Sequence, residues 1–158
     1  MSIIIRQVKK IDLTQIRKLA NDYGRLMNKV AENTISGFGD WAVPDMRNFF
    51  SEALHKKHKL FLVAVDKQKI IGFMLVRIIF HKEGKKIYPE GKLSETFIVE
   101  NYRGKGIAET MWQQALKWFK ENKVKVLQLH VFAGNTKPIA IYKKWGFKPM
   151  GIIMKRKI

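Results

Sequence analysis

Two glycines and two basic residues stand together in the run Arg103-Gly-Lys-Gly-Ile-Ala108. The β-prone residues Leu93 to Val99 precede this run, and apolar residues at helical spacing follow it. Glycine lets a backbone turn tightly and approach a ligand closely, and the first amides of a helix are unpaired donors that suit an anion. Arg103 and Lys105 add positive charge. The run therefore indicates a phosphate-binding turn, although a purely structural turn between a strand and a helix would use the same residues.

The spacing of these glycines differs from two common phosphate-binding motifs. The run lacks the Gly-Lys-Ser/Thr of a nucleoside triphosphate loop, and it lacks the third glycine of a dinucleotide fingerprint. A second pattern lies downstream, where Asn135 is followed seven residues later by Tyr142 and then by the pair Gly146-Phe147. Two linked patterns, each with its own internal spacing, are more specific than either alone.

Together these residues resemble the GNAT superfamily of acyl-CoA-dependent N-acetyltransferases. The first motif of that family is Arg or Gln, two residues, Gly, one residue, then Gly or Ala, and Arg103, Gly106 and Ala108 match it. The downstream pattern matches the second motif, with Pro138 where an alanine is common. Glu100-Asn101 likewise replaces a frequent Pro-Glu. The resemblance implies an enzyme that uses acetyl-CoA (coenzyme A) to acetylate an amine.

The resemblance also implies positions for the cofactor. The strand before the turn would pair with the pantetheine arm, the turn would hold the pyrophosphate, and the second motif would lie near the thioester. The cofactor-binding residues implied are Phe97, Ile98, Val99, Arg103, Gly104, Lys105, Gly106, Ile107, Ala108, Asn135 and Tyr142. Tyr142 is the implied catalytic acid, because a phenol can donate a proton to a departing thiolate. The alternatives are a core tyrosine at this position and an Asn135 that caps a helix.

Glu95 is an acid in the middle of an otherwise apolar and hydroxylated strand. Similar family members carry a glutamate there that deprotonates the amine, directly or through water, so Glu95 is the second catalytic candidate. Partial burial would raise its pKa and suit that role. A surface or paired strand acid is the alternative. The four histidines, at positions 55, 58, 81 and 130, form no recognisable ligand set, so we expect no metal site.

Patterns along the chain predict an α/β fold with a mixed, mostly antiparallel sheet flanked by helices, in the order β-α-α-β-β-β-α-β-α-β. Asp12, with Gln15 three positions on, indicates the capped start of the first helix, and residues 81–92 look like a polar loop. Strands are expected at residues 3–8, 60–65, 70–80, 93–99, 126–132 and within 149–158, and helices from 12, near 44, from about 108 to about 122 and at 136–145.

Size and composition indicate one globular domain over residues 1–158, and the resemblance implies that it is an N-acetyltransferase domain. Residues 59–148 would form the acetyl-CoA-binding core and residues 1–58 a variable part on the acceptor side. With no cysteine, disulfides and thiolate chemistry are excluded. No segment is apolar for long enough to span a membrane, so we expect a cytoplasmic protein without membrane partners.

The formal charge of +18 is unevenly distributed along the chain. Residues 22–52 hold five acids and three bases, a net charge of −2, which would suit an amine substrate. We therefore expect an acceptor site for a primary amine of a small molecule or a protein, lined by Tyr23, Glu32, Trp41 and Asp45. Alternatively, these acids only solvate two helices.

The same charge supports a competing interpretation from another class of protein. A basic surface would suit a nucleic-acid-associated module that kept the fold and lost turnover. The intact turn and Tyr142 argue against that loss, so nucleic acid is not the expected partner. The sequence leaves a homodimer open.

Overall fold

The computed structural model describes residues 2–32, 54 and 56–154. The chain falls into two compact units, one formed by residues 1–23 and 45–130 and the other by residues 24–44 and 131–158. The loop predicted after residue 33 and the helix predicted near residue 44 lie outside the described residues. No helix among those described is long and apolar enough to cross a membrane.

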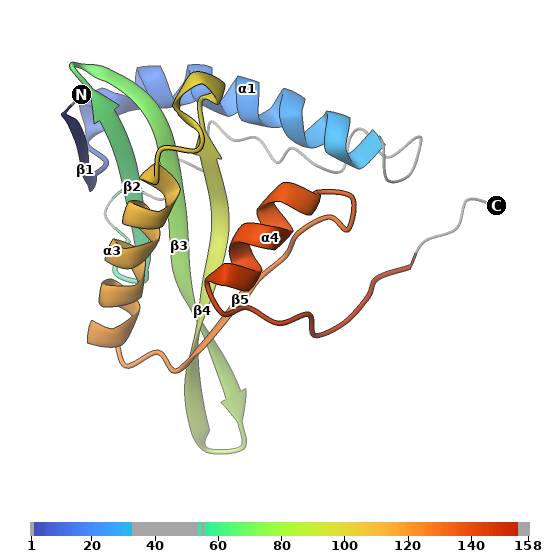
Figure 1. Ribbon diagram of the computed structural model, residues 1–158. Coiled ribbons are helices and arrows are strands. Elements are labelled where there is room, and N and C mark those ends of the chain that lie inside the picture. The colour runs from blue at the N-terminus through green and yellow to red at the C-terminus, as the bar shows by residue number, and fades with distance from the viewer. Residues whose placement is uncertain (1, 33–53, 55, 155–158) are drawn as a thin grey trace. The chain divides into compact units, whose positions relative to one another are not determined.

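The first unit is built on a five-stranded sheet in the order β1-β2-β3-β4-β5 (Figure 1). The first four strands pair antiparallel, and β5 pairs with β4 in parallel, which confirms the predicted mixed, mostly antiparallel sheet. The strands are β1 (Ile3–Gln7), β2 (Lys59–Asp66), β3 (Lys69–Glu83), β4 (Lys86–Ile98) and β5 (Val126–Leu129).

Helices cover both faces of this sheet (Figure 1). Helix α1 (Leu13–Glu32) buries Ile16, Leu19 and Ala20 in a core with aromatic residues of the strands, as its apolar spacing predicts. On the other face α3 (Ile107–Glu121) buries Met111, Trp112, Ala115 and Phe119. Gly91 of β4 lets α3 approach closely, because a Cβ atom there would lie 2.6 Å from a ring carbon of Phe119. In the second unit, α4 (Thr136–Lys144) confirms the last predicted helix.

Two predicted segments differ from the structure. Residues 81–92 are not a loop, because β3 continues to Glu83, Gly84 takes a left-handed φ of +58° in the turn, and β4 begins at Lys86. Both faces of this hairpin carry exposed residues, so the alternation of buried and exposed side chains that would identify its strands is absent. The predicted final strand is also wrong for residues 149–154, which form no strand; residues 155–158 lie outside the description.

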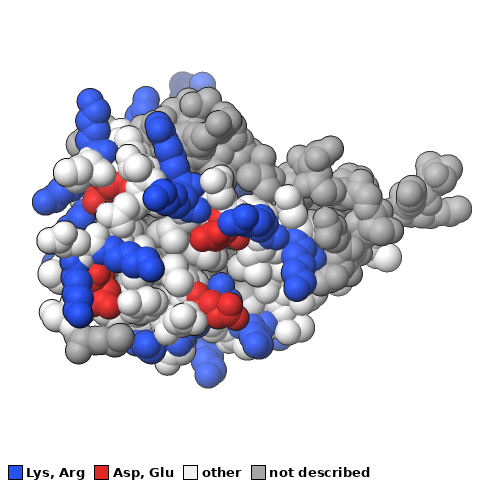
Figure 2. Space-filling model, turned by 90° about the horizontal axis from the view of Figure 1, so that it is seen from above, with Lys and Arg blue, Asp and Glu red and all other residues white. Residues whose placement is uncertain are grey.

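The surface is strongly basic but not uniformly so. Figure 2 shows one face of the molecule, on which side chains of Asp and Glu lie among those of Lys and Arg. On this face, opposite charges are interspersed.

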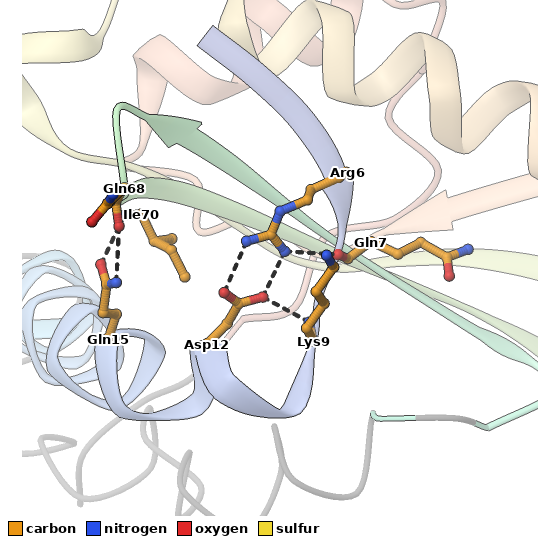
Figure 3. A network of polar contacts seen from close by, with 7 residues as sticks. All are labelled: Arg6, Gln7, Lys9, Asp12, Gln15, Gln68 and Ile70. Atoms are coloured by element: carbon orange, nitrogen blue, oxygen red, sulfur yellow. Dashed lines mark hydrogen bonds and ion pairs between the residues drawn. The ribbon is translucent and has the colours of Figure 1, made fainter.

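Asp12 joins β1 to the start of α1 (Figure 3). Its carboxylate accepts hydrogen bonds from Arg6 Nη1 at 2.6 Å, from Arg6 Nη2 at 2.9 Å and from the Lys9 amide at 2.7 Å, and the residue is only 4% exposed. The Arg6 guanidinium holds the pKa of Asp12 below its ordinary value, although burial opposes that shift. Asp12 therefore ends a short 3₁₀ turn (Lys10–Asp12), and the capping box predicted with Gln15 is wrong.

Gln15 instead anchors the turn between β2 and β3 (Figure 3). Its Nε2 donates to the carbonyl of Gln68 at 3.0 Å, and its Oε1 accepts from the amide of Ile70 at 2.9 Å. One side chain thus satisfies two backbone groups of a segment distant in sequence and fixes α1 against the sheet.

Replacing Asp12 by Asn should lower the free energy of unfolding by about 2 kcal/mol at neutral pH, because a buried charged acceptor loses its charge. The folded-state pKa of Asp12 is depressed, so its stabilisation is present above the ordinary Asp pKa and is lost as pH falls through the lowered value. In urea titrations across pH, the difference in free energy of unfolding between wild type and Asp12→Asn should therefore shrink as the pH falls. Glu83→Gln, at an exposed residue, is the control. A difference that persists or grows in acid would contradict this role of Asp12.

Candidate functional site

The candidate site begins where β4 loses its partner on one side. β5 pairs only with Glu90 to Leu93 of β4, so from Ser94 to Ile98 no described strand pairs with that edge. The pairing with β3 shifts at the same place, because Glu95 lies opposite Leu75 while Leu93 lies opposite Val76. Ser94 is therefore the extra residue of a bulge, a device that often lies next to active sites. An open strand edge of this kind can pair with an extended ligand.

The end of β4 leads through a 3₁₀ turn (Glu100–Tyr102) into the glycine run and α3. Gly104 and Gly106 have φ values of +74° and +75°, and Gly106 is the N-cap of α3. A Cβ atom at either glycine would meet no atom within 4 Å, so the left-handed backbone, rather than crowding, is what requires glycine. No side chain caps the helix, which leaves its first amides available to an anion.

Three side chains hold this turn in place. The Tyr102 hydroxyl donates to Asp66, at the end of β2, at 2.8 Å. Arg103 Nε donates to the carbonyl of Ile98 at 2.9 Å, and its guanidinium carbon lies 5.8 Å from the centre of the Phe97 ring. Lys105 Nζ lies 5.1 Å from the centre of the Tyr102 ring. Asp66 and Tyr102 were missed in the sequence, since 36 positions separate them and neither stands in a motif.

Glu95 and Tyr23 meet on the α1 side of the sheet. The Tyr23 hydroxyl donates a hydrogen bond to the Glu95 carboxylate. The Tyr23 ring lies edge-on to Phe73 and Phe97, with centroid distances of 5.8 and 5.9 Å. Burial raises the pKa of Glu95 above its ordinary value, while the bond from Tyr23 and the positive charge of Arg77 oppose the shift. Tyr23, expected only to line an acceptor site, therefore directly contacts the candidate base.

Two hydroxyls flank Glu95 on β4. Within the part of the chain that the structure describes, Ser94 Oγ and Thr96 Oγ1 are buried and have no hydrogen-bond partner. Buried hydroxyls normally find one, so these two atoms stand out beside Glu95. Their alternation with Glu95 along a strand could have pointed to them in the sequence.

The second unit carries Asn135 and Tyr142. Asn135 is the N-cap of α4, but its side chain makes no capping bond, so its interpretation as a simple helix cap is wrong. The half-buried Tyr142 ring has centroid distances of 5.6 Å to Trp145 and 6.3 Å to Phe147. Gly146, at a φ of +90°, ends α4. The Gly146 amide donates a hydrogen bond to the Lys143 carbonyl, and the Phe147 amide donates one to the Tyr142 carbonyl, both at 3.0 Å.

The predicted acceptor residues are only partly described. Trp41 and Asp45 lie outside the described residues. Glu32 is the last residue of α1, and its side chain is likewise not described. Among the described residues no group of His, Asp or Glu could hold a metal ion.

The sequence model of the acetyltransferase (GNAT) family matches residues 16–147. The chain belongs to this family. An N-alpha-acetyltransferase of Saccharolobus solfataricus is 29% identical over 110 residues, which are 66% of this chain and 66% of that protein. The match thus spans just under two thirds of the relative.

Two solved structures share the fold. A tetramutant of the BH1408 protein from Bacillus halodurans is 18% identical, with a TM-score of 0.82 over 98% of this chain and 99% of that one. The aminoglycoside N-acetyltransferase AAC(6')-Iy, in complex with CoA, is 20% identical, with a TM-score of 0.71 over 99% of this chain and 95% of that one.

The carboxyl carbon of Glu95, followed by NMR across pH, should titrate above the ordinary glutamate range because burial disfavours its charge. Tyr23→Phe should move that midpoint higher still, since the lost hydrogen bond lowers the pKa in the wild type. Tyr88→Phe, which removes a hydroxyl from an exposed tyrosine, is the control and should change nothing. A Glu95 midpoint that does not respond to Tyr23→Phe would contradict this hydrogen bond.

Proposed function

We propose that this protein is an acetyl-CoA-dependent N-acetyltransferase that transfers the acetyl group directly to a primary amine. The observation that carries the proposal is the continuity of the open β4 edge with two left-handed glycines at the start of α3. Residues 59–148 would serve as the acetyl-CoA-binding core, and residues 1–58 would contribute to the acceptor side.

The chemistry of the donor fits the groups that the first unit offers. An extended pantetheine amide chain can pair with the backbone of Phe97, Ile98 and Val99 as another strand would. The pyrophosphate can accept hydrogen bonds from the amides of residues 104–108, with Lys105 supplying charge. Arg103 donates one hydrogen bond, from Nε, to the Ile98 carbonyl at the end of β4. Its other guanidinium N–H groups would donate to the phosphate. Acetyl-CoA would supply an activated thioester.

The proton steps fall to Glu95 and Tyr142. Glu95 would take the proton of the attacking amine, and its raised pKa makes it a better base than an exposed glutamate. The amine nitrogen would add to the thioester carbonyl carbon, and the carbon–sulfur bond would then break to release coenzyme A as the leaving group. Tyr142 would give its proton to the departing sulfur. Tyr23 is a positioning residue, because it holds the Glu95 carboxylate.

We expect the acceptor to be the α-amino group of a protein. The relative aligned at 29% identity is an N-alpha-acetyltransferase, whereas the aminoglycoside enzyme shares 20% identity and shows the fold alone. Aromatic and acidic residues at Tyr23, Glu32, Trp41 and Asp45 would receive the amine, since a carboxylate attracts its protonated form and an aromatic ring excludes water. An aminoglycoside is the small-molecule alternative.

Thiol release from acetyl-CoA should occur with peptides that carry a free N-terminus and not with the same peptides blocked at the N-terminus. Tyr142→Phe should lower kcat by roughly a hundredfold, the usual contribution of a general acid, with little change in acetyl-CoA affinity. Ile141→Ala, which shortens an exposed side chain on the same helix, is the matched control. If none of the amines tested supports thiol release from acetyl-CoA, the proposed function is wrong. Wild-type turnover by Tyr142→Phe would contradict only the role of Tyr142 as the acid.

A further inference from the structure

The hairpin formed by the far ends of β3 and β4, residues Ile79–Glu90, is called the hairpin arm below. It lies at the opposite end of β4 from the glycine turn, and 13 residues at about 3.3 Å each put the two ends of that strand roughly 40 Å apart. In Figure 1 the arm extends past the ends of β2 and α3. Nothing in the proposed acetyl transfer uses it.

The hairpin arm exposes rings on both of its faces. Phe80 pairs with Pro89 and Lys82 with Ile87, and these four residues share one face. His81 pairs with Tyr88 on the other face. Phe80 is 49% exposed and Tyr88 is 44% exposed, so both rings are open to solvent. The His58 ring lies 4.7 Å from that of Phe80 and extends the first face.

Lysines surround these rings. Lys82, Lys85 and Lys86 lie on the arm, are exposed and form no ion pair with any residue that the structure describes. Lys56 and Lys57 precede His58 at one edge of the root. Lys125 precedes Val126, which pairs with Glu90 at the other edge.

The arm carries two acids, Glu83 and Glu90, against its own three lysines, and the three lysines at the root bring the set to six lysines and two acids. Glu90 is engaged by His81 at 2.6 Å and by Gln128 at 2.8 Å, which leaves Glu83 as the other acid of the arm.

We propose that the hairpin arm binds single-stranded RNA. Lysines along a ribbon suit a phosphate backbone, and exposed rings between them offer stacking surfaces to unpaired bases. Unpaired bases are the usual target of proteins that recognise RNA, whereas a duplex hides them. An acidic protein is the alternative partner, and competition by polyglutamate distinguishes it. A second copy of this chain would bring a further formal charge of +18 against the same lysines.

The test is fluorescence anisotropy of the full chain with labelled single-stranded oligouridylate at several salt concentrations. Wild type should bind with an affinity that falls as salt rises. The triple substitution Lys82→Gln, Lys85→Gln, Lys86→Gln should reduce the slope of log affinity against log salt by roughly two, at about 0.7 for each phosphate that is no longer neutralised. Tyr88→Ala should weaken binding roughly tenfold through the loss of base stacking.

The matched control is Lys10→Gln, Arg17→Gln, Lys18→Gln, which removes three exposed charges near the start of α1 and should change affinity much less. Thermal unfolding of each variant is measured to check that it is folded. Three results would each overturn the proposal: no binding by wild type, equal reductions of affinity in the arm and control triples, or duplex DNA or polyglutamate competing as well as oligouridylate. Acetyl transfer by the arm variants is measured in a separate assay. The RNA-binding result can therefore be interpreted even if the proposed acetyltransferase function is wrong.

Discussion

The parallel pairing of β4 with β5 ends at Leu93 and Leu129, and this limit creates the candidate site. A strand inside a sheet satisfies its backbone groups on both edges, but beyond Leu93 no described strand pairs with one edge of β4. The bulge at Ser94 shifts the strand at that point and leaves Glu95 opposite Leu75. The open edge then leads through the 3₁₀ turn to the left-handed glycines, so backbone groups, a candidate base and a candidate anion site follow one another along the chain.

Side-chain hydrogen bonds connect these parts to one another. Gln15 of α1 holds the turn between β2 and β3, and Asp66 at the end of β2 holds Tyr102 beside the glycine turn. The same helix carries Tyr23, which bonds to Glu95. Helix α1 therefore connects the candidate base to the glycine turn through the sheet. Its first turn in turn depends on the buried Asp12, which Arg6 neutralises.

Local patterns in the sequence identified the elements whose signals are strong. The helical spacing of Met111, Trp112, Ala115 and Phe119 predicted α3, because one face of that helix is buried in the sheet. The glycine run was placed correctly at the start of that helix, because only glycine takes the left-handed backbone without strain. The hairpin arm was missed because its strands are exposed on both faces and carry no alternation.

Contacts between distant residues could not be predicted in this way. Asp12 and Gln15 have the spacing of a capping box, yet tertiary partners, Arg6 and the β2–β3 turn, use their side chains instead. The bond between Tyr23 and Glu95 spans 72 positions and follows only from the packing of α1 on the sheet.

Calorimetric titration of acetyl-CoA into wild type, Gly106→Val and Gly84→Val tests the central claim most directly. Both glycines have a left-handed φ and open space around the missing Cβ, so valine imposes a similar backbone strain at each. Wild type and Gly84→Val should bind acetyl-CoA with the same affinity. Gly106→Val should bind it at least about tenfold more weakly, which corresponds to a loss of about 1.4 kcal/mol of binding free energy. Equal binding by all three proteins, or none by wild type, would contradict a phosphate site at the start of α3.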